Sequence, residues 1–179
     1  MRIISGEFKG RRITAPKKLP VRPTTDMAKE SLFNILNNSF YFDEISVLDL
    51  FSGTGNISYE FASRGTQHIL AVDANFGCIK FINETAESFK MPIKTIKSDV
   101  FKFLENTKQQ HTIIFADPPY NFDIEAFSKI PELVFTNSLL ETNGLLIIEH
   151  SKHTDLSNLE NYSNSKSYGG NMFSFFELQ

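Results

Sequence analysis

The chain has 179 residues, of which 41% are hydrophobic and 22% charged, proportions that suit one soluble domain with a sizeable core. Its one cysteine, Cys78, excludes an intramolecular disulfide and a cysteine-based metal cluster. No stretch approaches the ~18 apolar residues of a membrane span, and the opening Met-Arg-Ile-Ile has no signal-peptide pattern, so we expect a cytoplasmic protein.

The net charge of −3 is unevenly distributed along the chain. Residues 1–22 contain seven basic side chains and one acidic one, whereas the remainder contains eleven basic and twenty acidic side chains. A basic arm on an acidic body indicates a polyanionic partner for the arm, although a solvated tail explains the charge equally well. The acidic body argues against indiscriminate coating of DNA.

The amino-terminal segment predicts little regular structure. Residues 1–5 and 11–14 are short and partly apolar, and with Gly6 and Gly10 between them they predict a small hairpin. Three prolines make residues 15–23 an extended linker.

Beyond the linker, the pattern becomes one of alternating elements. Asp26 is expected to be the N-cap of a helix near residues 27–38, where apolar residues recur at helical spacing. Residues 151–167 are expected to form polar loops. This alternation predicts an α/β fold with a mostly parallel sheet covered on both faces. We expect strands at 47–50, 69–72, 93–97, 112–116, 145–149 and 172–178, and helices at 56–63, 76–89 and 99–105.

Four acidic residues accompany the ends of successive predicted strands. Asp49 precedes a glycine turn, and Asp73, Asp99 and Asp117 stand at or just beyond the next strand ends. In open α/β sheets, ligands bind beyond the carboxyl ends of the strands. One such acid is usually a cap or a turn residue, but four at one sheet edge indicate a binding site.

The glycine turn and its neighbours narrow the choice of ligand. Gly53 and Gly55 let the backbone approach a ligand at the start of a helix, but Ser58 stands where a dinucleotide fingerprint has a third glycine. Asp73 is placed to accept hydrogen bonds from ribose hydroxyls. Asp49 would repel a pyrophosphate, whereas the amino-acid tail and sulfonium of S-adenosylmethionine (SAM) would be attracted to it. A nicotinamide dehydrogenase is therefore disfavoured.

Residues 47 to about 120 resemble the class I SAM-dependent methyltransferases, because the glycine motif, the ribose-side acid, an adenine-side acid and a fourth-strand motif follow in that order. The resemblance implies a Rossmann-like fold with a mostly parallel seven-stranded sheet whose last strand is antiparallel. It implies SAM as cofactor, S-adenosyl-L-homocysteine as its product, and no metal. The residues implied to bind the cofactor are Asp49, Phe51, Ser52, Gly53, Gly55, Asp73, Asp99 and Val100.

The tip of the fourth strand, Asp117-Pro118-Pro119-Tyr120, resembles that of amino-methyltransferases, and we expect these four residues to be catalytic. An exocyclic amine on a base is a poor nucleophile because its lone pair is delocalised. The Asp117 carboxylate and the Pro118 carbonyl would hold its two N–H groups, with the prolines fixing the carbonyl direction and Tyr120 stacking on the base. Two alternatives remain. The motif could be a proline-rich turn that caps a strand, or the methylated amine could be a glutamine side chain, although enzymes of that kind usually carry Asn-Pro-Pro-Tyr.

Essentially the whole chain resembles the bacterial RsmD-type family, which methylates a guanine N2 of 16S rRNA. The resemblance is carried by Met1–Arg12, Arg22-Pro-Thr-Thr-Asp26, the glycine loop, the Asp-Pro-Pro-Tyr motif and Tyr168-Gly169. It implies an rRNA-contacting arm with a β-hairpin (residues 1–22), a methyltransferase domain (23–179), and a monomer acting on the small ribosomal subunit or its assembly intermediate. The implied nucleic-acid contacts are Arg2, Lys9, Arg11, Arg12, Arg22, Thr24 and Asp26, with Thr24, Asp26 and Glu30 shaping the wall beside the cofactor and the base.

Two departures from the family pattern affect RNA docking. Met27 and Lys29 replace arginines of the family pattern. Met27 removes one cationic contact, and Lys29 replaces a planar guanidinium, which can form two parallel hydrogen bonds, with a single ammonium charge. Gly170 and Asn171 replace an Asp-Thr pair. The alternatives are a DNA adenine-N6 methyltransferase, which normally needs a further recognition domain, and a non-catalytic RNA-binding or assembly factor, which predicts eroded motifs.

The remaining reactive residue types are expected to be structural. Cys78 is interpreted as a small apolar side chain in a helix. Phe51 and Phe122 lie next to the expected site, and Phe122 either supports the base or packs in the core. The histidines lack metal-binding spacing and are expected at the surface or in loops: His68, His111, His150 and His153.

Overall fold

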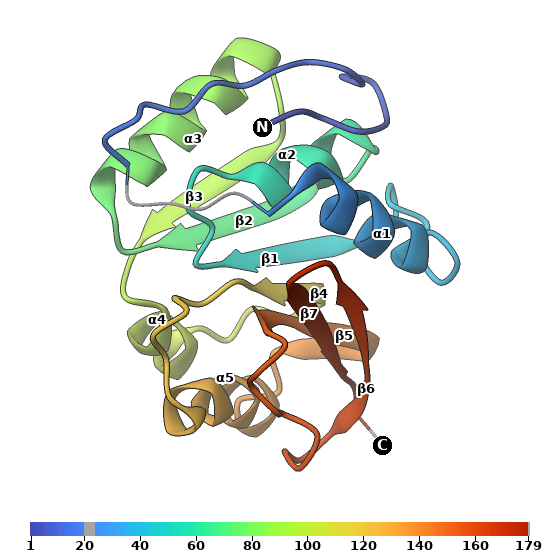
Figure 1. Cartoon of the computed structure of the whole chain (residues 1–179). Coiled ribbons are helices and arrows are strands. Elements are labelled where there is room, and N and C mark those ends of the chain that lie inside the picture. Colours follow the sequence, from blue (N-terminus) through green and yellow to red (C-terminus); the bar gives the residue numbers. More distant parts are fainter. Residues whose placement is uncertain (20–23, 179) are drawn as a thin grey trace.

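The computed structural model describes residues 1–19 and 24–178, in which a twisted seven-stranded sheet lies between two layers of helices (Figure 1). The strand order is β3-β2-β1-β4-β5-β7-β6, with parallel pairing from β3 through β5 and antiparallel pairing of β7 with both of its neighbours. This confirms the predicted fold class. The elements are α1 (Asp26–Leu36), β1 (Ser46–Leu50), α2 (Asn56–Ser63), β2 (His68–Asp73), α3 (Phe76–Phe89), β3 (Ile93–Lys97), α4 (Val100–Asn106), β4 (His111–Ala116), α5 (Ile124–Thr136), β5 (Leu140–Ser151), β6 (Tyr162–Tyr168) and β7 (Asn171–Phe176).

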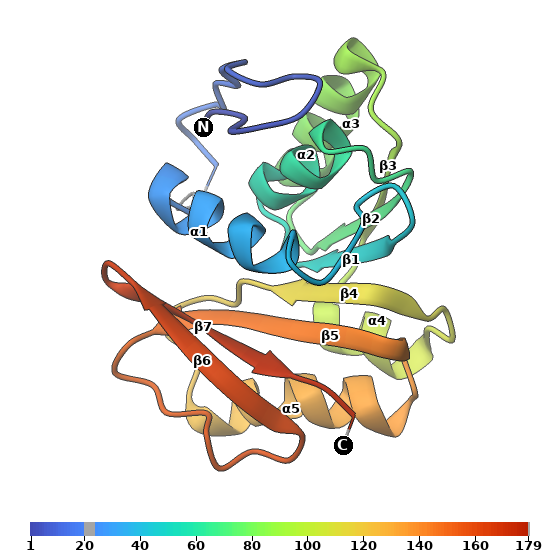
Figure 2. The same cartoon turned by 90° about the vertical axis from the view of Figure 1, so that its right-hand side faces the viewer.

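Helices cover both faces of the central strands, with α1, α2 and α3 on one side and α4 and α5 on the other (Figure 2). Because side chains alternate along a strand, Ile113 and Phe115 of β4 pack under α1–α3, and Ile114 and Ala116 pack toward α4 and α5. The central strands are therefore mainly apolar on both faces. No helix in the described part of the chain is long and apolar enough to cross a bilayer.

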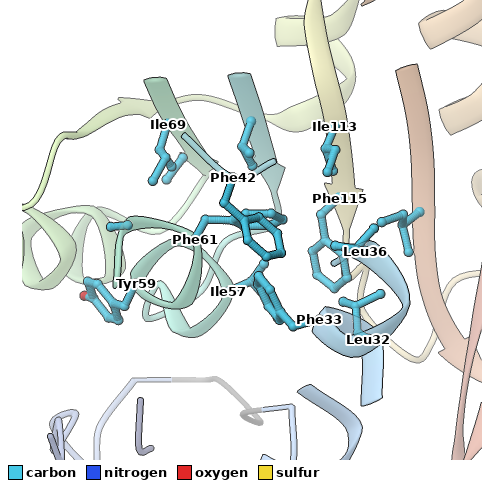
Figure 3. Close-up of a cluster of buried hydrophobic side chains, with 14 of the residues drawn as sticks. Leu32, Phe33, Leu36, Phe42, Ile57, Tyr59, Phe61, Ile69, Ile113 and Phe115 are labelled. Carbon is cyan, nitrogen blue, oxygen red and sulfur yellow. The ribbon is translucent and has the colours of Figure 1, made fainter. Parts of the chain in front are cut away.

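Aromatic rings dominate the core beneath α1 and α2 (Figure 3). Phe33, Phe42 and Phe61 lie with ring centroids 4.6 to 6.0 Å apart, in edge-on and tilted contacts. The guanidinium of Arg64 lies 4.6 Å from the Phe33 ring centroid and closes this cluster toward solvent. This cluster fixes α1 against α2.

Several element predictions need correction. The N-cap of α1 is Thr25, whose hydroxyl accepts from the Ala28 N–H, and Asp26 is the first helical residue. Helix α5 was not predicted, and it contains Pro131 in its interior. Strand β6 replaces part of the predicted polar loop. Strand β5 begins before its predicted start at residue 145 and includes Asn143, which has a φ of 63°, and its register with β4 shifts in this region.

The two segments of the predicted hairpin pair antiparallel, through one bridge between Arg2 and Arg12 and backbone hydrogen bonds on both sides of it. The pairing is too short to form regular strands. Within the predicted linker, residues 16–19 form a turn closed by the Leu19 N–H and the Pro16 carbonyl. The rest of the linker, residues 20–23, lies outside the described residues.

Two of the four histidines are not surface residues. His111 in β4 and His150 in β5 are both 2% exposed. His150 contacts the Ser174 hydroxyl at 2.7 Å through Nε2. Burial lowers the pKa of His111 to about 4 and also lowers the pKa of His150, so both rings are neutral at pH 7.

We expect Phe33→Ala to lower the free energy of unfolding by about 3–5 kcal/mol, because it removes a fully buried ring from the aromatic cluster. Urea denaturation with an unchanged m-value measures this loss. Phe76→Ala, at a ring that is 65% exposed, is the matched control and should change stability by less than about 0.5 kcal/mol. Equal losses for the two variants would contradict this account of the core.

Candidate active site

A cavity of about 560 Å³ opens at the carboxyl edge of the parallel strands. Its size lies within the range of small-molecule sites. The segments that follow β1, β2, β3 and β4 all contribute to it, which is the arrangement predicted from the four strand-end acids. The predicted residues that line it are Asp49, Phe51, Ser52, Gly53, Asp73, Asp99, Val100, Asp117, Pro118, Pro119, Tyr120, Phe122 and Thr24.

The glycine turn depends on left-handed backbone at three positions. Phe51, Gly53 and Gly55 have φ values of 55°, 52° and 84°. A Cβ on Gly55 would meet Ile82 and Tyr59 atoms at 2.9 Å, so this glycine allows close packing against α2 and α3. Gly55 itself does not line the cavity, unlike Gly53. Its contribution to the site is the shape of the turn.

Asp49 is a buried carboxylate at the wall of the cavity. It is the penultimate residue of β1, it points to the α2 side of the sheet, and the Ser58 hydroxyl donates to it at 2.5 Å. Burial raises the pKa of Asp49 from 3.8 to about 7, opposed by the Ser58 hydrogen bonds and assisted by the charge of Asp73. The carboxylate is thus poised to favour a nearby cation.

Asp73 and Asp99 are held by backbone N–H groups. Both oxygens of Asp73 accept hydrogen bonds at 2.8 Å, from the N–H groups of Gly53 and Asn75, which ties the glycine turn to the end of β2. Asp99 is the N-cap of α4 and accepts from the Lys102 N–H. Each carboxylate oxygen has a second lone pair, so these contacts leave capacity for a ligand.

The donors and acceptors in the cavity fit the SAM molecule predicted from the sequence. The Ser52 hydroxyl is buried, lines the cavity, and has no hydrogen-bond partner within residues 1–19 and 24–178. A buried hydroxyl of this kind is costly unless a ligand satisfies it. Together with the Asp49, Asp73 and Asp99 carboxylates, it suits a ligand that carries an ammonium group, hydroxyls and an amino-purine.

The Asp117–Tyr120 segment forms the opposite wall of the same cavity. The Asp117 N–H donates to the Leu50 carbonyl at 3.3 Å, which extends the β1–β4 ladder by one residue and fixes the backbone there. The Phe122 N–H donates to the Pro119 carbonyl and closes a turn. Pro118 is buried, whereas the Tyr120 side chain is 47% exposed at the opening.

An aromatic group supports this wall. Phe122 stacks on Phe101 with ring centroids 5.9 Å apart, and it contacts Phe51 and Phe127 edge-on. Phe51 and Phe122 both line the cavity. Phe122 therefore has the packing role that was one of its two expected roles, and it also presents a surface to the cavity.

The amino-terminal wall contains one residue of the predicted RNA-side set. Thr24 lines the cavity, and its hydroxyl donates to Glu149 at 2.8 Å. Asp26 lies outside the cavity and pairs with Arg2 at 3.1 Å. Glu30 is exposed on α1 and does not line the cavity. Asn171 donates to Glu149 from the start of β7, so the departure from the family pattern places an amide on this buried acid.

The basic residues of the arm divide into different environments. Lys9, Arg11 and Arg12 are exposed, and Arg22 lies outside the described residues. Arg2 and Arg12 line a second, open cavity of about 490 Å³ together with Met1 and Asp26.

The interpretation of Lys29 as a softened RNA contact is wrong. Its side chain is 1% exposed, and its ammonium donates to the Arg2 carbonyl, to Asn56 Oδ1 and to Glu60. Lys29 is a buried structural cation.

Other site residues were missed in the sequence. Asn56, Asn75 and Cys78 line the cavity, and Ser58 supports Asp49. Asn75 could have been found, because an asparagine directly before a helix is a frequent N-cap and Asn75 caps α3. Cys78 is buried in α3, which confirms its predicted apolar role. No cluster of three potential metal ligands occurs in the described part of the chain.

Comparison with known proteins gives consistent matches along the chain. A family model described as Conserved hypothetical protein 95 matches residues 1–177. The Bacillus subtilis protein named "Putative rRNA methyltransferase YlbH" is 33% identical over 161 residues, covering 87% of this chain and 85% of that protein. The Escherichia coli K12 protein named ribosomal RNA small subunit methyltransferase D is 29% identical over 150 residues, covering 83% and 71%. A solved structure of a hypothetical protein from Thermus thermophilus superposes with a TM-score of 0.85 at 24% identity, covering 99% of each chain.

We expect SAM to bind up to about tenfold more weakly at pH 6 than at pH 8. Because the pKa of Asp49 is about 7, the carboxylate is mostly protonated at pH 6 and no longer attracts the ammonium of the cofactor. Titration calorimetry at the two pH values measures the dissociation constants. An affinity that is flat across this range would contradict the role given to Asp49.

Asp49→Asn is the matched control, and it should bind SAM weakly and with little pH dependence. Without cofactor, the native protein holds a proton on Asp49 between about pH 4 and 7 that the unfolded chain has lost, so the free energy of unfolding falls as the pH rises through this window. Above pH 7 the variant should therefore be more stable than the unmodified protein, by up to about 4 kcal/mol.

Proposed function

The chain belongs to the Conserved hypothetical protein 95 family, the RsmD-type methyltransferases, and we propose that it transfers a methyl group from SAM to the exocyclic N2 amine of a guanine in 16S rRNA. One observation carries the proposal. A single cavity joins the acidic residues suited to SAM with the Asp117–Tyr120 motif suited to an amine. Cofactor and acceptor can thus meet in one space without any further domain.

The cofactor half of the cavity is assigned to four polar side chains. SAM supplies an electrophilic methyl group on a sulfonium. Asp49 attracts the ammonium of its amino-acid tail, and Ser52 gains the hydrogen-bond partner that it otherwise lacks. Asp73 accepts from the ribose hydroxyls, and Asp99 accepts from the adenine amine. All four act by binding and orienting, which is how such a site contributes to the rate of transfer.

The acceptor half is assigned to the fourth-strand tip. The Asp117 carboxylate and the Pro118 carbonyl accept the two N–H groups of the guanine amine, which directs the nitrogen lone pair toward the methyl group. Tyr120, half exposed at the opening, stacks on the base. The new N–C bond replaces the S–C bond, and one proton then leaves the nitrogen to Asp117 or to water. A base must leave its stack to enter the cavity.

Contact with the phosphate backbone of the rRNA is assigned to the arm. The exposed Lys9, Arg11 and Arg12, together with Arg2, contact rRNA phosphates and set the orientation of the substrate. The arm (residues 1–22) thus serves docking and the remainder (23–179) serves transfer. The protein acts in the cytoplasm as a monomer, on the small ribosomal subunit or its assembly intermediate.

Asp117→Ala should lower the rate of methyl transfer by about 10³-fold or more, because it removes an acceptor that aligns the amine. Asp117→Asn keeps one acceptor oxygen and should lose less, about 10²-fold. The assay uses methyl-labelled SAM and small subunits from cells that lack this gene, with naked 16S rRNA and duplex DNA in parallel and nucleoside analysis of the product. Label found only in DNA would overturn the proposed function.

Tyr120→Ala should weaken the use of small subunits by about 10- to 100-fold in kcat/KM, which corresponds to the ~1–3 kcal/mol of one base–aromatic stacking contact. Tyr120→Phe keeps the ring and should stay within about threefold of the unmodified enzyme. Steady-state kinetics with small subunits measures both variants. Similar losses in the two variants would assign the effect to the hydroxyl and contradict the stacking role.

A further inference from the structure

The arm is held to the body by two buried apolar side chains, Ile3 and Ile13, and by hydrogen bonds of its backbone, two of which end on one buried carboxylate. Glu60 in α2 is fully buried and accepts hydrogen bonds from the N–H groups of Ile4 and Ser5 at 2.9 and 3.0 Å. Arg64 pairs with the same carboxylate at 2.9 Å. Hydrogen bonds in which the acceptor is a charged carboxylate are stronger than those between neutral groups, so this segment of the arm is fixed to α2.

The end of α2 adds a second attachment. The Ser63 hydroxyl donates to the Ser5 carbonyl at 2.6 Å and accepts from the Phe8 N–H at 3.0 Å. Between these residues, Gly6 has a φ of +84°, and a Cβ placed on it would lie 1.8 Å from the Ser63 carbonyl oxygen. The arm backbone thus lies directly on the helix end, where only glycine fits.

Lys29 links this attachment to the cavity. Its ammonium has three N–H donors and three partners: the Arg2 carbonyl at 2.7 Å, Asn56 Oδ1 at 2.8 Å and Glu60 at 3.2 Å. Asn56 in turn donates to the Thr24 carbonyl at 3.1 Å. A chain of buried hydrogen bonds therefore runs from the arm backbone to the cavity wall.

Thr24 is fixed at both of its polar groups. Its carbonyl accepts from Asn56, and its hydroxyl donates to Glu149 of β5. Thr24 stands at the end of this chain of contacts and lines the cavity itself. Any displacement of the arm relative to α2 would have to strain these buried contacts.

We propose that Lys29 and Glu60 are positioning residues that make the arm and the cavity wall one rigid unit, so that rRNA bound on the arm is held in register with the cavity. The inference rests on the proposed function for the identity of the substrate. A mobile arm would bind phosphates and leave the base unplaced. With a fixed arm, binding of the rRNA phosphates also orients the target base in the cavity. A displacement of the reacting groups by about 1 Å can lower the reaction rate 10²-fold.

Gly6→Ala tests this with a matched control in the same segment. Gly10 has a φ of +83°, so an alanine there meets almost the same backbone strain as an alanine at Gly6. No heavy atom, however, lies within 4 Å of a Cβ placed on Gly10. Gly6→Ala should raise hydrogen exchange of the amides at residues 4–8 by at least about tenfold, and lower kcat/KM for small subunits by about 10- to 100-fold, mainly through KM. The dissociation constant for SAM should stay within about twofold. Gly10→Ala should stay within about threefold of the unmodified enzyme in all three measurements.

A second pair of variants tests the buried cation. Lys29→Met should lower kcat/KM for small subunits as Gly6→Ala does, because the links to the Arg2 carbonyl and to Asn56 are lost. Hydrogen exchange of the Ile4 and Ser5 amides should change little, because Glu60 keeps Arg64 and these two N–H groups. Lys29→Arg restores a cation with several donors and should recover most of the activity. Lys80→Met, at an exposed ion pair with Glu84, is the surface control and should have no effect.

The outcomes separate this inference from the proposed function. Unmodified enzyme that fails to methylate small subunits would remove the proposed function, and with it the rRNA role of the arm. Active unmodified enzyme combined with a Gly6→Ala variant that uses small subunits normally would overturn the inference alone. Parallel losses of SAM affinity and small-subunit methylation in Gly6→Ala and Lys29→Met would also overturn it, because they would indicate general structural damage.

Discussion

The site depends on a constraint of parallel sheets, whose central strands are apolar on both faces because helices cover both sides. Ile113 to Ala116 of β4 illustrate this, since their side chains alternate between two buried clusters. Polar side chains therefore gather where the strands end. The carboxyl ends of β1, β2, β3 and β4 meet at one edge, and the cavity forms there. The chemistry of the site is thus a property of strand ends and of the turns that follow them.

Asp49 is an exception to this rule, and its burial explains its behaviour. It lies inside β1, where its face of the strand turns toward α2 and away from water. The Ser58 hydroxyl offsets only part of the cost of burial. A cationic ligand would offset the rest, so a group that weakens the empty protein strengthens the complex. Active sites commonly hold groups whose environment is unfavourable without the substrate or cofactor.

The sequence was sufficient where local patterns decide structure. The apolar runs predict the strands β1 to β4. The glycines and the acidic residues directly after these runs predict the turn and the binding edge of the sheet. It was insufficient where distant contacts decide. Lys29 reads as a surface cation, because its partners Asn56 and Glu60 lie about thirty residues away. Helix α5 was not predicted because it contains Pro131, and a proline in a helix interior normally ends the helix. His111 is buried by its place in β4, which no local pattern marks.

The contacts that hold the arm also set the order in which the molecule can be completed during synthesis. Ile4 and Ser5 leave the ribosome before their partner Glu60, which follows more than fifty residues later. Thr24 must wait for Glu149, 125 residues further along the chain. Contacts of such sequence separation form late in folding. The nascent chain therefore carries Ile4 and Ser5 unattached until α2 has been made, and Thr24 lacks its contact with Glu149 until β5 has been made.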